Sequence, residues 1–401
     1  MKSGELREKN SSLFTLHSPL LNKSMNKIKI GIVFGGRSGE HEVSIRSAKT
    51  VIEQIDRDKY DVIPIAITKD GKWLNPVESL GLFPHQTQEL LLDEIGNFPR
   101  NSIAFAGDTN YHGLIKLETQ LGEERVEKLD VVFPVLHGTF GEDGTIQGLF
   151  EMSDIPYVGC GVLASASGMD KAFMKILFRD AGLPICKYVW FLRSEWENSD
   201  EATINQIEAQ LGYPCFVKPA NLGSSVGVSK ATDKLSLREA ISLAARYDRK
   251  IIVEECLDMR EIECAVMGNE HPRASLPGEY LIRDENKKFL DYTEKYAGTG
   301  NNEFVVPAPI SEELTKKIQQ MAITAFKAID GTGFARVDFF LRNDTGALLV
   351  NEINTIPGLT DASGFPKMWA GTDIEFSQVI DALITLAIER HKDKSRNQTS
   401  F

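Results

Sequence analysis

The sequence predicts an α/β protein (α+β overall) of two or three domains, the first built on a doubly wound parallel sheet. Its 401 residues are too many for one ordinary hydrophobic core. Residues 27–36 form an apolar strand that ends in two glycines, like the first strand of such a sheet. Residues 334–341 and 347–354 predict a hairpin with a polar turn at 342–346, and this hairpin belongs to a second unit.

Composition and charge narrow the class of protein. Apolar residues make up 42% and charged residues 25% of the chain, as in soluble globular proteins. The net charge of −12 argues against a nucleic-acid surface, because phosphate binding requires a basic face. The chain has no apolar run near the roughly 18 residues of a membrane span. Its five cysteines include no CxxC pair, so we expect buried thiols in a reducing cytoplasm rather than zinc or disulfides.

The N-terminal part of the chain combines an extension with the first sheet. Residues 1–26 are polar and too broken for a secretory signal, so they predict a disordered extension. The glycines after the first strand do not spell GxGxxG, and a dinucleotide site is therefore not supported. Residues 45–55 carry a helical apolar pattern, and Glu42 stands at the N-terminus of that helix. Its carboxylate either complements the helix dipole or faces the crevice beyond the strand ends and takes an ammonium group.

The rest of the first unit offers one further candidate. Residues 75–128 look irregular, with a hairpin around Gly122 and no recognisable chemistry. Residues 129–138 predict a buried strand that carries His137 at its polar end. Ligands of open α/β sheets bind beyond the carboxyl ends of the strands, which is where His137 lies. A single histidine at such a place is nevertheless more often structural.

Segments in the middle of the chain suggest nucleotide binding. A strand delivers Lys218 to a glycine/serine loop over 221–227, whose N–H groups can fold over phosphates above this lysine. The loop lacks GxxxxGK[ST] and is no P-loop, and a plain hairpin turn is the alternative. Extended backbone beside Glu254 can read an adenine edge, while a carboxylate holds ribose hydroxyls; solvated edge charges are the alternative. The long polar stretch 286–302 predicts a lid.

The hairpin carries the strongest site signal. Strict alternation puts Arg336 and Asp338 on one face of its first strand, and Glu352 and Asn354 on one face of its second. Two carboxylates and an amide oxygen are hard ligands, suited to Mg²⁺ that also holds substrate phosphates. The alternative is a solvated polar face with an Arg–Asp ion pair. The flanking residues are too apolar for a solvent face, and a buried charge cluster is costly unless it has a role.

Assembled, these residues resemble the D-alanine–D-alanine ligases of the ATP-grasp superfamily over residues 27–392. The resemblance rests on residues 41–44 (HEVS), 136–138 (LHG), 141–144 (GEDG), 169–171 (MDK), 218–227 (KPANLGSSVG), 253–261 (VEECLDMRE), 295–296 (KY), 336–338 (RVD) and 351–358 (NEINTIPG). It implies an ATP-grasp fold behind a Rossmann-like N-terminal domain. The implied parts are an extension 1–26, an N-terminal domain 27–160, a central lobe 161–253, a C-terminal lobe 254–392 with a lid 286–302, and a tail 393–401.

The resemblance implies how nucleotide and metal would be held. Two Mg²⁺ (or Mn²⁺) ions would be bound by Asp338, Glu352 and Asn354. Glu255 stands where many members of the family carry lysine, so the family pattern at the adenine is altered there. The residues implied to bind ATP are Lys171, Lys218, Ser224, Glu254, Glu255, Leu257, Glu261 and Lys295.

Substrate binding and catalysis are implied in the same way. Glu42, with His137 nearby, would take the ammonium group of the first D-alanine. Ser363 and the N–H of Gly364 would take the carboxylate of the second. The remaining catalytic residues would link Glu42 to the lid, meet the transferred phosphate and stabilise the tetrahedral intermediate: Ser224, Tyr296, Lys295, Arg336 and the Gly358 N–H.

The implied activity is ATP-dependent formation of D-alanyl-D-alanine for peptidoglycan precursor synthesis. ATP phosphorylates the carboxylate of the first D-alanine, and the amine of the second attacks the acylphosphate and releases phosphate. A closing lid would exclude water, because the acylphosphate hydrolyses. The implied enzyme is a cytoplasmic homodimer that binds two D-alanine molecules, with neither nucleic acid nor membrane as a partner.

Three alternative functions are considered beside this one. A sister ligase that joins D-alanine to D-lactate or D-serine shares nearly every motif. A different ATP-grasp enzyme would not need Glu42, His137 and Tyr296 together. A non-catalytic nucleotide-binding regulator would not need the intact set of Arg336 with the three implied metal ligands.

Overall fold

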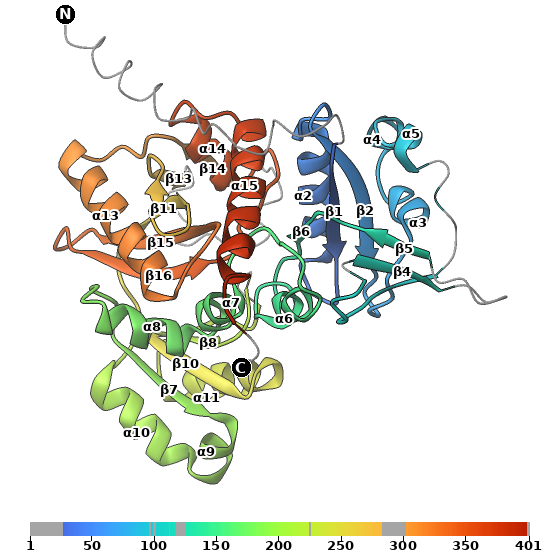
Figure 1. The fold of residues 1–401 in the computed structure, drawn as a ribbon. Coiled ribbons are helices and arrows are strands. Elements are labelled where there is room, and N and C mark those ends of the chain that lie inside the picture. Colours follow the sequence, from blue (N-terminus) through green and yellow to red (C-terminus); the bar gives the residue numbers. More distant parts are fainter. Residues whose placement is uncertain are drawn as a thin grey trace, which may run out of the picture.

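The computed structural model describes residues 27–398, except 96–97, 99–101, 112, 118–124, 224–225 and 283–301. The predicted extension 1–26, the predicted site residues Ser224, Lys295 and Tyr296, and nearly all of the predicted lid lie outside the described residues. The described chain forms three lobes, each built around its own sheet (Figure 1). Within these described ranges, helices that are long and apolar enough to cross a membrane are absent.

The first lobe contains the predicted parallel sheet. Strand β1 (Ile28–Gly35) lies between β2 (Tyr60–Ile67) and β6 (Val131–Val135), and both pairings are parallel. These strands are almost entirely buried, as expected for apolar runs covered on both faces. Helix α2 (His41–Gln54) leads from β1 towards β2 and packs on β1. Because the strands are parallel, the segments that follow β1 and β6 meet at one edge of the sheet.

The prediction that residues 75–128 are irregular was wrong. They form three short helices and a small antiparallel sheet of order β3-β4-β5. The predicted hairpin is confirmed by the pairing of β4 with β5, although its turn lies outside the described residues. The elements are α3 (Pro76–Leu80), α4 (His85–Glu89), α5 (Leu92–Ile95), β3 (Ser102–Phe105), β4 (Gly113–Leu117) and β5 (Arg125–Lys128).

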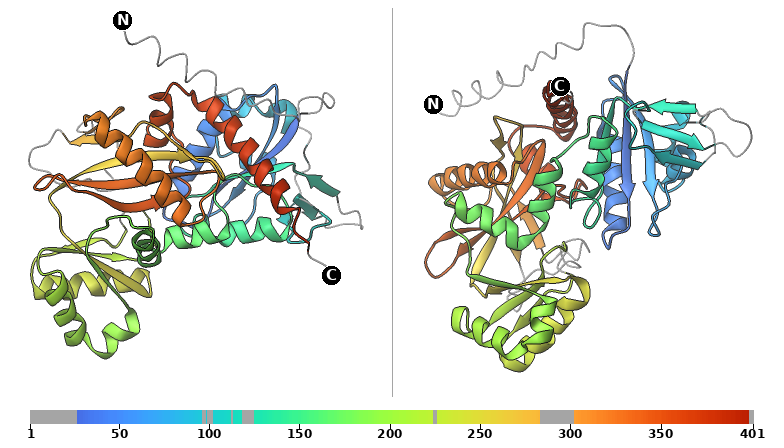
Figure 2. Two further views of the ribbon diagram at one scale, coloured as in Figure 1. Left: turned by 60° about the vertical axis from the view of Figure 1, so that its left-hand side comes forward. Right: turned by 60° about the horizontal axis from the view of Figure 1, so that its bottom comes forward.

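The central lobe is an antiparallel sheet of order β7-β10-β8-β9 with helices packed on one face. It stands apart from the other two lobes in the views of Figure 2. Three helices lead into it, and Asp170 caps the third by accepting from the N–H groups of Ala172 and Phe173. The elements are α6 (Thr145–Met152), α7 (Val162–Met169), α8 (Lys171–Asp180), β7 (Tyr188–Leu192), α9 (Arg193–Asn198), α10 (Asp200–Gln210), β8 (Cys215–Pro219), β9 (Ser229–Ala231), α11 (Lys234–Tyr247) and β10 (Lys250–Glu255).

The C-terminal lobe contains the predicted hairpin. Its sheet has the order β14-β13-β11-β15-β16, and the hairpin is β15 (Phe334–Arg342) with β16 (Leu348–Asn354). Helix α13 (Glu312–Ala328) packs on this sheet. The sequence predicts it over residues 311–329, one residue longer at each end. The other elements are β11 (Met259–Met267), β12 (Arg273–Ala274), β13 (Gly278–Ile282), β14 (Asn302–Val305), α14 (Gly364–Ala370) and α15 (Phe376–Lys394).

Helix α15 joins the first and last lobes into one hydrophobic core. Its buried residues cluster with those of β1, β6 and α14, and Figure 1 shows it standing between the two sheets. The sequence predicts this helix over residues 375–390, and in the structure it extends four residues further, to Lys394. The five cysteines are free, and four of them are buried, as predicted.

Candidate active site

The hairpin gathers the four residues expected from its alternation. Apolar residues of β15 such as Val337 and Phe339 pack in the core under α13, so Arg336 and Asp338 project from the other face. Asp338 is paired with Glu352, and Arg336 with Asn354. The guanidinium forks onto the carboxylate, with Nε–Oδ1 and Nη2–Oδ2 distances of 2.6 Å. The Arg–Asp ion pair is therefore present, but on a buried face, since Asp338 is only 9% exposed.

A β-bulge sets the direction of Glu352. Asp338 pairs with Glu352 but the next residue, Phe339, pairs with Val350, which leaves Asn351 as the extra residue of β16. Leu348 and Val350 belong to the core, so strict alternation would have turned Glu352 towards the core as well. The extra residue of the bulge shifts the alternation of side chains by one position. Ile353 therefore points into the core and Glu352 points towards the site.

The carboxylates of the hairpin repel one another. Burial raises the pKa of Asp338 to about 7, the Arg336 charge opposes this, and Glu263 and Glu352 add to the increase. Glu263 enters from β11, with Oε2 3.4 Å from Arg336 Nε. Among the described residues, no three His, Cys, Asp or Glu side chains are close enough to hold a metal ion. The donor set available to a cation is instead two carboxylates and an amide, all with hard oxygen atoms.

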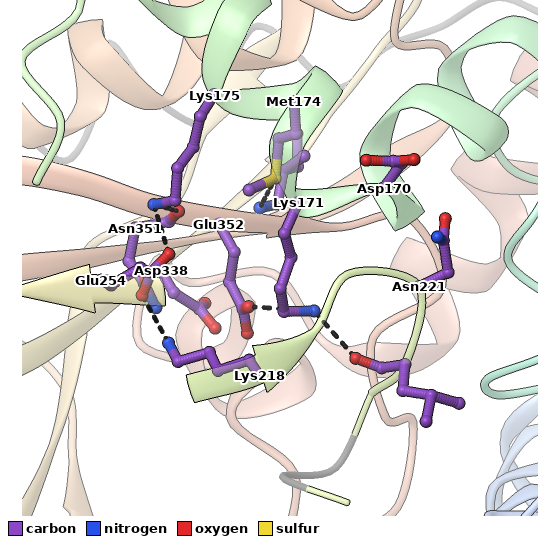
Figure 3. A network of polar contacts seen from close by, with 12 residues as sticks. Asp170, Lys171, Met174, Lys175, Lys218, Asn221, Glu254, Asp338, Asn351 and Glu352 are labelled. Atoms are coloured by element: carbon purple, nitrogen blue, oxygen red, sulfur yellow. Dashed lines mark hydrogen bonds and ion pairs between the residues drawn. The ribbon is translucent and has the colours of Figure 1, made fainter. Parts of the chain in front are cut away.

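Lysines from two other elements converge on the hairpin (Figure 3). Lys171 begins α8, and its Nζ donates to the Leu222 carbonyl at 2.8 Å and lies 3.7 Å from Glu352 Oε2. Lys218 comes from β8, whose neighbours Cys215 and Val217 pack under the helices, so Lys218 faces the hairpin. The structure thus brings the two predicted phosphate-binding lysines to the face with the two carboxylates.

The carboxylate of Glu254 binds lysines. It lies 2.6 Å from Lys218 Nζ and 3.0 Å from Lys175 Nζ, and it is almost fully buried. Burial works against its ionisation, but the two lysine charges prevail and lower the pKa of Glu254 to about 2. The side chain is thus engaged in ion pairs with two lysines, whereas a contact with adenine was predicted for it.

The other residues predicted around the adenine and ribose lie on or beside the connection from β10 to β11. Glu255 accepts from the Lys187 N–H at 2.7 Å and so holds the end of β10 to the start of β7. Leu257 is half-buried in the connection itself. Glu261 lies on β11, opposite Phe340 of β15.

The expectation that Glu42 binds substrate is corrected by the structure. Glu42 lies in the first turn of α2 with a 68% exposed side chain, and it pairs with Lys69 at 2.9 Å on the surface. Glu40, two residues earlier, faces the other way. A methyl group added to Gly138 would come within 2.8 Å of Glu40 Oε2, and one added to Gly223 within 3.1 Å. The carboxylate of Glu40 therefore lies between the loop after β6 and the loop after β8.

His137 holds the first lobe to the hairpin rather than offering a free nitrogen. Its Nδ1 donates to the Ile356 carbonyl, and its Nε2 accepts from Ser47 Oγ, both at 2.9 Å. The Ser47 hydroxyl in turn accepts from the Leu359 N–H at 3.3 Å. These hydrogen bonds fit the neutral imidazole, and burial lowers the pKa of His137 in agreement. The predicted direct contact with substrate is not supported in this arrangement.

Glu142 is a second acid at this junction, and no role was predicted for it. It accepts from the Gly138 N–H at 2.5 Å and the Ile356 N–H at 3.3 Å, so it also ties the loop after β6 to the end of β16. Burial, aided by the negative charge of Glu40, raises the pKa of Glu142 to about 8. The motif GEDG was visible in the sequence, but its partner Ile356, 214 residues away, was not.

The residues predicted for the second carboxylate lie after the hairpin. Gly358 is buried in the segment that follows β16, and Ser363 directly precedes α14. The Ser363 hydroxyl is 2.8 Å from Thr360 Oγ1 and accepts from the Thr360 N–H at 3.1 Å. A methyl group on Gly364 would come within 2.6 Å of Glu263 Oε2, so the wall of this subsite tolerates no side chain there.

Comparisons with known proteins agree with the site. Family models match in both halves, "D-ala D-ala ligase N-terminus" at residues 29–160 and "D-ala D-ala ligase C-terminus" at 177–385. The D-alanine–D-alanine ligase of Ruminiclostridium cellulolyticum is 48% identical, with 94% of this chain and 99% of the relative covered. That of Natranaerobius thermophilus is 44% identical, with the same coverage.

Solved structures show the same relationship. The VanG D-Ala:D-Ser ligase from Enterococcus faecalis has a TM-score of 0.76 and 37% identity, over 90% of this chain and 100% of its own. The D-alanine–D-alanine ligase from Coxiella burnetii has a TM-score of 0.75 and 35% identity, over 92% and 98%. The predicted ATP-grasp fold is thereby confirmed. The chain belongs to the D-alanine–D-alanine ligase family.

Proposed function

We propose that this protein joins two D-alanine molecules to D-alanyl-D-alanine at the expense of ATP, for peptidoglycan precursor synthesis. One observation carries the proposal. Lys171 and Lys218 reach the buried face that presents Asp338 and Glu352, so one site combines cations for phosphates with oxygens for a divalent metal. The family to which the chain belongs supplies the substrate class.

The proposed reaction has two steps. A carboxylate oxygen of the first D-alanine attacks the γ-phosphorus of ATP, and ADP leaves. The amine nitrogen of the second D-alanine then attacks the acyl carbon; the C–O bond to phosphate breaks, and the amine loses its proton. Lys171 and Lys218 bind the phosphates and spread their charge, while Arg336 and the Gly358 N–H stabilise the oxyanion of the tetrahedral intermediate.

The residues at the hairpin fit a pair of Mg²⁺ (or Mn²⁺) ions. Asp338, Glu352 and Asn354 offer hard oxygens, and a cation would offset both the burial and, to a lesser extent, the neighbouring carboxylates that raise the pKa of Asp338. The ions supply electrostatic stabilisation of the transferred phosphoryl group.

Glu40, rather than Glu42, is the proposed partner of the first D-alanine's ammonium group. Its carboxylate lies where the loops after β6 and β8 meet, next to Gly138 and Gly223. Ser363 and the Gly364 N–H remain the proposed partners of the second carboxylate. Ser224, Lys295 and Tyr296 keep their predicted roles as proposals, since they lie outside the described residues.

Product analysis tests the proposal. The purified protein is given ATP, Mg²⁺ and D-alanine alone, or D-alanine with equimolar D-lactate or D-serine, and the products are identified by mass. We expect phosphate release and D-alanyl-D-alanine as the main product in all three mixtures. A predominant D-alanyl-D-lactate or D-alanyl-D-serine product would reassign the acceptor, and no phosphate release with any acceptor would refute the ligase.

We also propose that the protein acts in the cytoplasm as a homodimer. ATP as substrate and the buried free thiols support a reducing compartment, and the family resemblance supports the dimer. Light scattering after size exclusion measures the assembly directly. A mass near 44.6 kDa would correspond to a monomer and would overturn the dimer.

A further inference from the structure

Lys175 carries a buried charge that the proposed mechanism does not use. It lies on α8, one turn after Lys171, and is fully buried. Its Nζ is 3.0 Å from Glu254 Oε1, donates to the Asn351 carbonyl at 3.2 Å and lies 3.5 Å from Cys186 Sγ. One ammonium group therefore links a helix to the central sheet and to the hairpin, as Figure 3 shows.

The charges around Glu254 explain why two lysines are present. Glu254 pairs with both Lys175 and Lys218, within an almost dry environment. Lys218 is the one of the two that the proposed function assigns to the phosphates of ATP. If it were the sole partner, its departure would leave a buried carboxylate uncompensated, which is strongly unfavourable. Lys175, by contrast, is completely buried on α8 beside Glu254, away from the solvent that a phosphate would enter from.

The Asn351 contact places the same lysine at the β-bulge. Asn351 is the extra residue that turns Glu352 towards the site, and a bulge leaves backbone groups outside the ladder. Lys175 Nζ donates to the Asn351 carbonyl, while the adjacent Met174 sulfur lies 3.4 Å from the Ile353 nitrogen. Helix α8 thus covers the bulge with two successive side chains.

We infer that Lys175 is a positioning residue for nucleotide binding: it remains paired with Glu254 and so frees Lys218 to reach the phosphates. This inference rests on the proposed function, because it takes ATP as the ligand of Lys218. It predicts that the contribution of Lys175 to nucleotide affinity depends on the charge of Glu254. A lysine with a merely structural role would act equally whether or not that charge is present.

A double-mutant cycle on nucleotide binding tests the inference. The affinity of the full-length protein for Mg²⁺ and the non-hydrolysable analogue AMP-PNP is measured by calorimetry for wild type, Lys175→Met, Glu254→Gln and the double variant. In the presence of Glu254, we expect Lys175→Met to weaken binding by at least about tenfold, because Lys218 is then held by the buried carboxylate. In the Glu254→Gln background, the same change should weaken binding by less than about threefold.

Matched variants separate this effect from damage to the fold. Cys186→Ala removes the third contact of Lys175 but no charge, and it should leave AMP-PNP affinity within about twofold of wild type. If Lys175→Met does not fold, Lys175→Gln keeps hydrogen-bond donors without the charge and should show the same coupling. Equal weakening in both backgrounds, or none in either, would overturn the inference. Wild-type protein that binds AMP-PNP but releases no phosphate with D-alanine would instead contradict the proposed function.

Discussion

Glu40 and Glu42 show how strongly one helical turn decides the role of a side chain. Glu42 lies inside the first turn of α2 and pairs with Lys69 in solvent, where an ion pair contributes little. Glu40 precedes the helix and its carboxylate lies between Gly138 and Gly223. The motif HEVS and its neighbours predict an acid at this edge of the sheet. They do not predict which acid, because the apolar pattern places the helix start only at Ile45, whereas the helix begins at His41.

Glutamine substitutions at these two positions form a matched pair. Glu40→Gln should lower kcat/KM for D-alanine by roughly ten- to hundredfold, because a charge-assisted contact with the ammonium group is lost. Glu42→Gln should change it less than about twofold, since its side chain is 68% exposed and faces Lys69. The measurement is phosphate release as a function of D-alanine concentration. If Glu42→Gln is the damaging change, Glu42 and not Glu40 binds the ammonium group.

Glu352 provides the second test at the scale of single residues. Glu352→Gln keeps the shape of the side chain but removes the charge that would face the metal and the phosphates. We expect kcat to fall by several orders of magnitude, on the order of 10³ or more, because the transferred phosphoryl charge loses its compensation. The melting temperature should stay close to that of wild type, since Glu352 is partly exposed. Near-normal turnover at saturating Mg²⁺ would exclude Glu352 from the site.

At the scale of secondary-structure elements, the positions of the site residues depend on the register of the strands as much as on their apolar and polar alternation. The hairpin could be predicted because alternation and a polar turn mark β15 and β16. The bulge at Asn351 could not, since it follows from the pairing of the successive residues Asp338 and Phe339 with Glu352 and Val350, which are two positions apart. Elements α3 to α5 were missed for another reason: helices of four or five residues are too short for a 3.6-residue period to show. Lys175 was missed because a lysine on an apolar helix face gives no sign of its partners.

The junction between the loop after β6 and the end of β16 should respond to pH through Glu142. Its pKa is raised from 4.5 to about 8 on folding. The stability linked to this group is therefore fully present below pH 4.5 and is lost as the pH rises through 8. Glu142→Gln removes the titration, so the fall in melting temperature between pH 5 and pH 8 should be smaller in the variant.

Differential scanning fluorimetry at a series of pH values measures this difference, with Glu279→Gln as a control. Glu279 is also a buried acid, but it is held by Arg260 on the far side of β11. An identical pH dependence in wild type and Glu142→Gln would show that Glu142 does not titrate between these values.

At the scale of the whole molecule, the first and last lobes share one hydrophobic core although they are far apart in the sequence. The sequence predicts a helix over residues 375–390, but a helical pattern does not name the surface that covers the helix. The structure packs α15 against β6 and α2 of the first lobe as well as against α14. The apolar strands and long helices of the lobes are thus visible in the sequence. The packing of the last helix on the first sheet is not, because it depends on tertiary contacts.

Arg390 supplies polar contacts between α15 and the rest of the protein, in addition to the apolar packing. From α15 it donates to the carbonyls of Gly159 and Tyr157 and to Thr332 Oγ1, and it stacks 4.2 Å from the centroid of the Tyr157 ring. It therefore fastens the last helix both to the end of the first lobe and to the segment before β15. Lysine at this position keeps the charge but cannot span three acceptors, because it lacks the planar fork of arginine.

We expect Arg390→Lys to lower the free energy of unfolding by about 1.5–3 kcal/mol, the usual cost of losing hydrogen bonds to a charged group. Urea denaturation followed by circular dichroism gives this value. Arg396→Lys, whose side chain is 80% exposed just after the same helix, should stay within about 0.5 kcal/mol of wild type. Because Arg390 lies outside the candidate active site, kcat of the folded variant should be unchanged. Equal stabilities of the two variants would mean that packing of α15 alone holds the lobes together, and that the arginine contacts add nothing measurable.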